Sequence, residues 1–223
     1  MTTMQPAQLQ TVNWTVYRTL VGIGLICALV IVTVFESTSP IININKKRAL
    51  ERAVYRVLPH ALSFTAYTLD SDNTLKKAAD NNTPKVYACY NAHRELIGFA
   101  IPAHGMGYQD TIQLLYGYST QSRSIEGMVI LQSRETPGLG SKIEENGFLG
   151  NFRRINISLT PGAGQLEHPL ELIKNIPKSH DWQIDAVTGA TVSSQAVVAI
   201  LNRSLGFWTP LIAKQQERFQ LEH

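Results

Sequence analysis

The longest apolar run of the chain lies close to its start. Residues 19–35 (TLVGIGLICALVIVTVF) contain no charged side chain. With their flanking residues they approach the roughly 20 residues that a helix needs to cross a bilayer core. A cleaved signal peptide would have a basic start and a small-residue cleavage site, but the segment before Arg18 has no Lys or Arg and polar residues follow Glu36. The pattern predicts a tail over residues 1–15 and an uncleaved transmembrane anchor over residues 16–36.

A second helical pattern follows the anchor. Between Asn45 and Leu58 apolar residues recur at helical spacing and charged residues fill the remaining positions. The apolar positions are Leu50, Val54, Val57 and Leu58. Because proline cannot continue a helix, Pro59 is expected to end it. We therefore expect a connecting helix over residues 37–58.

The pattern then changes to short runs typical of strands, separated by turn residues. The runs cover residues 85–91, 96–102, 111–118 and 125–132, and residues 93–95 form a plausible hairpin turn between the first two. Further along we expect a loop at 134–140, a short helix to Glu144, a strand at 154–158, a Pro/Gly-rich stretch at 160–164 and a closing helix. The pattern predicts a single α+β domain over residues 59–220, with a twisted antiparallel sheet and flanking helices.

Composition narrows the function classes. The 223 residues include 20 Lys and Arg and 17 Asp and Glu, and the longest basic run is Lys46-Lys47-Arg48, so nucleic acid is not an expected partner. The six histidines lack metal-ligand spacing, and no metal site is expected. Cys27 and Cys89 cannot build a disulfide framework. Cys89 lies in an expected strand, where a core position is favoured over a reactive thiol.

A hydroxyl-rich segment precedes the closing helix. Residues 185–194 read DAVTGATVSS, and the apolar stripe that begins at Val197 continues through Leu205. Free N–H groups and the helix dipole make such a helix start a site for phosphate, and Gly189 allows close approach of the backbone. The alternative is that Thr and Ser only cap the helix, and spacing alone favours this simpler role.

The segment Asp185-x-x-Thr188-Gly189-Ala190-Thr191 resembles the flavinylation motif of the FMN-binding domain family. The resemblance implies that Thr191 carries FMN as a phosphoester, installed by a separate flavin transferase that splits FAD. It also implies that Asp185 takes part in recognition by the transferase. The other cofactor-binding candidates here are Thr188, Gly189 and Ala190, with Ser193 and Ser194 as phosphate or helix-cap partners.

Two upstream segments extend this resemblance. Residues 135–140 (ETPGLG) are similar to a loop that helps house the flavin in two related ion-pumping complexes, within the G subunit of the Rnf complex and the C subunit of the sodium-pumping NADH:quinone reductase. Taken alone, Pro-Gly indicates an ordinary turn. The segment 105–108 (GMGY) is a weaker match, and Tyr108 either flanks the flavin or fills the core. The implied cofactor-binding residues are Glu135, Thr136, Gly138, Leu139 and Tyr108.

The resemblance covers the whole chain in order and favours the Rnf type. It implies a membrane-anchored flavoprotein subunit that relays electrons through covalent FMN in an ion-translocating ferredoxin:NAD oxidoreductase complex. No independent catalytic site is expected, because nearby carboxylates such as Glu144-Glu145 are typical of a solvated face. The implied partners are the other membrane subunits of the Rnf complex. The alternatives are a membrane-tethered sensor that binds FMN non-covalently and a flavin-free scaffold subunit.

Two signals disagree about the orientation of the anchor. Basic residues gather after it, at positions 46–48 and 52, whereas Arg18 stands alone before it. Cytoplasmic flanks are usually the more basic ones, so the charge count places the domain inside the cell. The resemblance implies a single-pass protein of the bacterial inner membrane with its flavin domain in the periplasm, and we adopt that orientation as the expectation.

Overall fold

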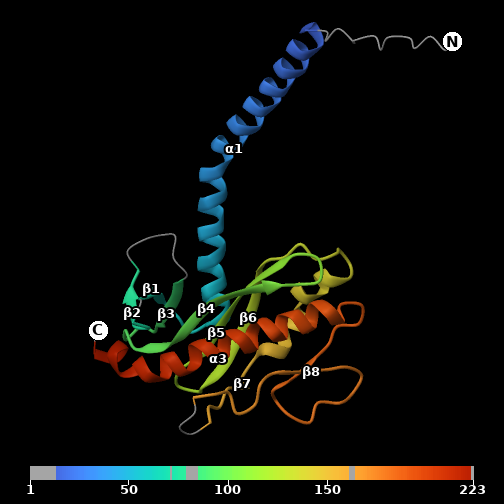
Figure 1. Cartoon of the computed structure of the whole chain (residues 1–223). Helices are drawn as coiled ribbons and strands as arrows, with labels where there is room; N and C mark the ends of the chain where they lie inside the picture. The colour runs from blue at the N-terminus through green and yellow to red at the C-terminus, as the bar shows by residue number, and fades with distance from the viewer. Residues whose placement is uncertain (1–13, 71, 79–84, 161–163, 222–223) are drawn as a thin grey trace, which may run out of the picture. The chain divides into compact units, whose positions relative to one another are not determined.

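The structure is a computed structural model that describes residues 14–70, 72–78, 85–160 and 164–221 (Figure 1). The side chains of Lys85 and of residues 216–221 are not described. Most of the expected tail over residues 1–15, and most of the Pro/Gly-rich stretch at 160–164, lie outside these ranges. The chain divides after Arg48 into two compact units.

The first unit consists of most of helix α1 (Trp14–Val57). The expected anchor and connecting helix are parts of this one helix of 44 residues, and Pro40 lies inside it without ending it. Its most apolar window has a mean hydropathy of 2.4, and no residue of that window is buried. An exposed apolar helix of this length is compatible with a membrane span.

The second unit is built on a seven-stranded antiparallel sheet in the order β2-β1-β3-β4-β5-β6-β7. The strands are β1 (Ser63–Leu69), β2 (Leu75–Lys77), β3 (Lys85–Tyr90), β4 (Leu96–Met106), β5 (Thr111–Ser119), β6 (Ser124–Gln132) and β7 (Ile155–Asn156). The predicted α+β class and antiparallel sheet are confirmed. The four central strands match the predicted runs, and β1 and β2 extend the sheet beyond them.

Short helices and a second, small sheet lead to the closing helix. The 3-10 helix η1 (Gly140–Glu144), helix α2 (Asn146–Leu149) and the 3-10 helix η2 (Gly150–Phe152) follow β6. Strands β8 (Glu171–Ile173) and β9 (Gln183–Asp185) pair in parallel, a pairing that the sequence pattern did not predict. Helix α3 (Thr191–Leu221) begins shortly after β9 ends.

The sheet has a hydrophobic core on each face, because successive residues of a strand point to opposite sides. In β4, Phe99 and Ile101 belong to the core that includes Val197, Leu201 and Leu205 of α3, which crosses the sheet in Figure 1. Ala100 belongs to the other core, with Ala53, Val54 and Val57 from the last turns of α1. Helix α3 also has the length and composition of a membrane span, but 39% of its apolar window is buried. Its apolar stripe therefore serves the core of the domain.

Cys89 lies in the second of these cores and is fully buried. Burial raises the pKa of its thiol from 9.0 to about 12, with partial relief from a hydrogen bond to the backbone of Ala100. A buried thiol with a raised pKa is a poor nucleophile. The interpretation of Cys89 as a core residue is confirmed.

Candidate functional site

The hydroxyl-rich segment lies where the sequence placed it, at the start of α3. After β9 ends at Asp185, the chain turns through a hydrogen bond from the Ala190 N–H to the Val187 carbonyl at 2.9 Å. Gly189 has a φ of +85°, a left-handed conformation that glycine adopts without a steric penalty. Thr191 is then the first residue of the helix, with a half-buried side chain.

The two serine hydroxyls that follow Thr191 are used within the protein. The Ser194 hydroxyl donates to the Ala190 carbonyl at 2.8 Å and accepts from the Val187 N–H at 3.3 Å, which fixes the turn before the helix. The Ser193 hydroxyl donates to the carboxylate of Glu135 at 2.5 Å. Both serines are almost fully buried. The arrangement gives them a role in shaping the loop.

The first turn of α3 presents open backbone donors. Helical hydrogen bonding begins with the Ser194 N–H, which donates to the Ala190 carbonyl at 2.8 Å. Within the described ranges, no acceptor from the chain receives the N–H groups of residues 191–193. Open donors at a helix N-terminus favour an anionic group such as phosphate.

Glu135 joins the three predicted motif segments. Its side chain is only 5% exposed. One carboxylate oxygen, Oε1, accepts from the N–H groups of Tyr108 and Gln109 at 2.9 and 3.0 Å. The other, Oε2, accepts from the Ser193 hydroxyl. The GMGY segment, the ETPGLG loop and the start of α3 are therefore held together by one buried carboxylate.

Two glycines make room for that carboxylate. A Cβ atom added at Gly107 would lie 2.4 Å from Oε1 of Glu135. One added at Gly140 would lie 2.6 Å from Oε2. Real Cβ atoms do not approach oxygen so closely, so each glycine is required by the position of Glu135.

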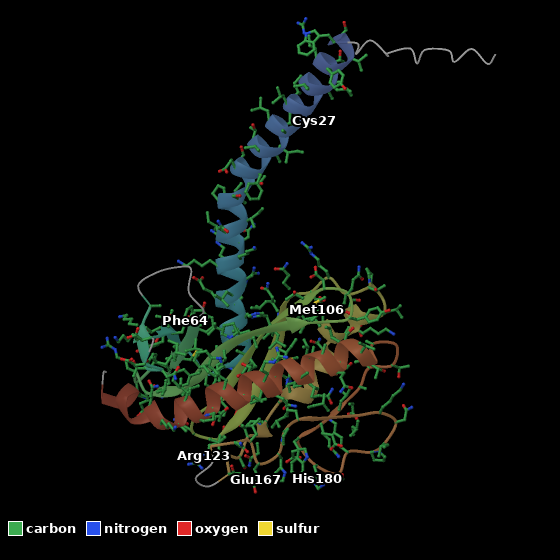
Figure 2. All side chains as sticks on the ribbon, viewed as in Figure 1. Cys27, Phe64, Met106, Arg123, Glu167 and His180 are labelled. Carbon is green, nitrogen blue, oxygen red and sulfur yellow. The ribbon has the colours of Figure 1, made fainter. Side chains whose placement is uncertain are left out.

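The joined segments place large apolar side chains at the surface. Tyr108 is 69% exposed, so it does not fill the core, and Leu139 and Val192 are also more than half exposed. Figure 2 shows another, Met106, at the end of β4. Leu139 lies against the Gly189 turn, with its Cδ2 atom 3.5 Å from the position of an added Cβ. An exposed apolar surface beside polar donors is typical of a ligand site.

The remaining predicted residues shape the loop or lie at its rim. The Thr136 hydroxyl donates to the Gln109 side-chain carbonyl at 3.1 Å, and the Gly138 N–H donates to the Ser141 hydroxyl at 3.0 Å. Thr188 is exposed and Ala190 is buried. Asp185 is exposed and forms an ion pair with Lys178 at 3.3 Å. These positions leave Asp185 and Thr188 accessible to another protein.

The structure adds a residue that sequence reasoning missed. Lys142 of η1 is half-buried, and its Nζ atom lies 4.0 Å from the position of a Cβ added at Gly189. The signal that could have found it is its position, two residues after the ETPGLG loop. A cavity of about 900 Å³ lies elsewhere in the domain, and no candidate residue lines it. The candidate site lies at the surface, where Tyr108, Leu139 and Val192 are exposed.

Comparison with known proteins also indicates that this region is a flavin-binding domain. Residues 107–206 match the family described as FMN-binding domain. The G subunit of an ion-translocating oxidoreductase complex from Methanosarcina acetivorans is 28% identical over 191 residues, which cover 85% of this chain and 90% of that protein. The G subunit of a proton-translocating ferredoxin:NAD(+) oxidoreductase complex from Clostridium ljungdahlii is 28% identical over 172 residues, which cover 77% of this chain and 78% of that protein.

A solved structure confirms the fold. The crystal structure of Shewanella oneidensis NqrC superimposes with a TM-score of 0.62 at 17% identity and covers 78% of this chain and 99% of that chain. The resemblance to the FMN-binding domain family, which was inferred from the motifs, is confirmed by the match over residues 107–206. That range includes the ETPGLG loop and the segment that ends at Thr191.

Proposed function

We propose that this chain is a membrane-anchored flavoprotein subunit that relays electrons in an ion-translocating ferredoxin:NAD oxidoreductase complex. The observation that carries the proposal is the position of Thr191, on the first turn of α3 beside open N–H donors and within a region that matches an FMN-binding domain. The relatives, which are named as G subunits of such complexes, support it.

The chemistry of the donors fits a phosphate ester at Thr191. A hydroxyl at a helix start, with open N–H groups around it, suits a phosphodiester anion. In the proposed maturation, a flavin transferase binds the exposed rim around Asp185 and Thr188. A bond forms between the Thr191 Oγ and the phosphorus of the FMN half of FAD, the P–O bond to AMP breaks, AMP leaves, and the hydroxyl proton passes to a base of the transferase.

The chain itself provides attachment, orientation and an apolar surface. FMN supplies the capacity to accept and pass single electrons. Glu135 fixes the ETPGLG loop against α3, and Tyr108, Leu139 and Val192 offer exposed apolar contact for a flat aromatic ring. No acid–base pair of the chain is needed for electron transfer. The open surface leaves room for electron-transfer partners to approach.

The location of the proposed relay is inferred from the apolar helix α1 and from the resemblance to the family. Helix α1 spans a bacterial inner membrane once, and the domain lies in the periplasm, where the transferase acts on it. The other membrane subunits of the Rnf complex are the electron-transfer partners. Because the basic residues after the anchor favour the opposite orientation, we base this topology on the resemblance.

An assay on the assembled complex tests the proposal. Membranes that contain the complex with wild-type chain or with Thr191→Ala are compared for NAD reduction by reduced ferredoxin, with the content of each protein measured by immunoblot. We expect Thr191→Ala to abolish most of the activity while the complex still assembles. Normal activity with assembled Thr191→Ala complex would support the scaffold alternative, and flavin that is released on denaturation of the wild-type chain would support the sensor.

A further inference from the structure

Lys142 places a positive charge beside the loop that leads to Thr191. Its Nζ atom lies 4.0 Å from the position of a Cβ added at Gly189, two residues before Thr191. Helix η1, which carries Lys142, packs on the start of α3, because a Cβ added at Gly140 would lie 2.9 Å from the Ser193 hydroxyl oxygen. The ammonium group therefore lies beside the turn that leads into α3.

No carboxylate neutralises this ammonium group in the described part of the chain. The ion pairs found there join Lys76 to Asp70, Arg134 to Asp110 and Lys178 to Asp185. The hydrogen-bond partners of Glu135 in the same loop region are Tyr108, Gln109 and Ser193, and Lys142 is not among them. Partial burial of a lysine without a counter-ion costs free energy. An anion bound beside the ammonium group would lower that cost.

The same place offers uncharged donors for an anion. The N–H groups of residues 191–193 are open, and the positive end of the α3 dipole adds to their effect. A phosphodiester bears a single negative charge, which an adjacent ammonium group can neutralise. The two kinds of donor reach the same loop from different elements, η1 and α3.

We propose that Lys142 is a positioning residue that neutralises the phosphate group joined to Thr191. This inference rests on the proposed attachment of FMN to Thr191. Lys142 acts at two stages: it favours the approach of the FMN-side phosphate of FAD while Thr191 Oγ attacks it, and it then fixes the phosphodiester of the loaded protein.

The test compares three variants of the full-length chain in detergent. Lys142→Met removes the charge and keeps an unbranched side chain, Lys142→Arg restores the charge, and Lys77→Met is the matched control on the exposed edge strand β2. The initial rate of FMN incorporation is measured by intact mass with a purified flavin transferase and FAD. The ³¹P NMR spectrum of each loaded protein is then recorded.

We expect Lys142→Met to load roughly tenfold or more slowly at saturating FAD, as when a positioned charge is removed from a phosphoryl-transfer site. Lys142→Arg should recover most of the rate, and Lys77→Met should match the wild type. The phosphodiester resonance should shift in Lys142→Met and stay in place in Lys77→Met.

Each other outcome overturns the inference in a distinguishable way. Equal loading rates and equal ³¹P spectra for Lys142→Met and wild type would show that Lys142 does not act on the phosphate. Slow loading of Lys142→Met with an unchanged ³¹P spectrum would show that Lys142 only contacts the transferase. A wild-type chain that is never loaded would overturn the proposed function itself.

Discussion

The Oε2 atom of Glu135 accepts a hydrogen bond of 2.5 Å from the hydroxyl of Ser193, 58 residues away in the sequence. This contact joins the ETPGLG loop to the first turn of α3. Glu135 is buried, and among the described residues it accepts from backbone N–H groups and a hydroxyl. Hydrogen bonds to a charged acceptor are stronger than those between neutral groups. The geometry around Thr191 therefore depends on a residue that lies beneath the surface on which a ligand would bind.

Replacement of Glu135 tests this dependence. Glu135→Ala leaves the N–H groups of Tyr108 and Gln109 and the Ser193 hydroxyl without their acceptor, and we expect the free energy of unfolding to fall by about 2–4 kcal/mol. Glu135→Gln keeps one acceptor oxygen and the side-chain shape, so its loss should be clearly smaller. Urea unfolding of the full-length chain in detergent measures both. Equal losses for the two variants would contradict the role of the hydrogen bonds.

Gly140 is expected to tolerate no side chain. A Cβ atom there would meet both the Glu135 carboxylate and the Ser193 hydroxyl within 3 Å. Gly140→Ala should therefore lower stability by about 1–3 kcal/mol through overpacking. Gly147→Ala in α2 is the matched control, because nothing lies within 4 Å of its added Cβ. Similar melting temperatures for the two variants would show that the loop can move away from Glu135.

Thr209 of α3 is expected to be more stable as valine. Its side chain is 1% exposed, and its Oγ1 atom is a buried polar atom for which the described residues provide no hydrogen-bond partner. Replacing such a hydroxyl by a methyl group of the same shape removes an unpaired polar atom. Thr209→Val should raise the free energy of unfolding by about 0.5–1.5 kcal/mol. Destabilisation by this variant would show that the hydroxyl has a partner.

Cys89 is expected to resist thiol reagents while the domain is folded. The raised pKa of its thiol, about 12, lowers the reactive thiolate fraction at pH 8 by roughly a thousandfold relative to a thiol of pKa 9.0. Maleimide labelling of the Cys27→Ser chain, before and after denaturation, measures this. Rapid labelling of the folded chain would restore the reactive-thiol alternative.

The same pKa makes stability dependent on pH. The pKa of the Cys89 thiol is higher in the folded state than in the unfolded state, so its contribution is fully present below about pH 9 and declines as pH rises toward 12. In the Cys27→Ser background, the stability difference between Cys89 and Cys89→Ala chains should therefore shrink over that range. A constant difference across the range would contradict the raised pKa.

The sequence pattern predicted those helices and strands whose residue types repeat at a regular spacing over several positions. Runs of strand-forming residues predicted β3 to β6, and the apolar stripe after Thr191 predicted α3. Strands β2, β8 and β9 have three residues each, too few to show an alternation. The seven residues of β1 have a mixed burial pattern without clear alternation. The expected anchor over residues 16–36 and the connecting helix over 37–58 are one continuous helix in the structure, which a local pattern on each side could not show.

The candidate site was predicted as three separate motifs, and their convergence needed the structure. The bond from Tyr108 N–H to Glu135 spans 27 residues, and local periodicity cannot indicate such a contact. Sequence reasoning gave Glu135 as a cofactor-binding residue and Ser193 and Ser194 as phosphate or helix-cap partners, and the structure adds the hydrogen bonds that these three side chains make within the chain. It gave Lys142 no role, because a single lysine carries no pattern of its own.

The most direct measurement is intact and peptide mass spectrometry of the chain after co-expression with a flavin transferase. We predict the mass of FMN less water on the peptide that contains Thr191, and its loss in Thr191→Ala. An unmodified Thr191 peptide in the presence of an active transferase would contradict the covalent-flavin account, and Thr191 would then be only the first residue of a capped helix.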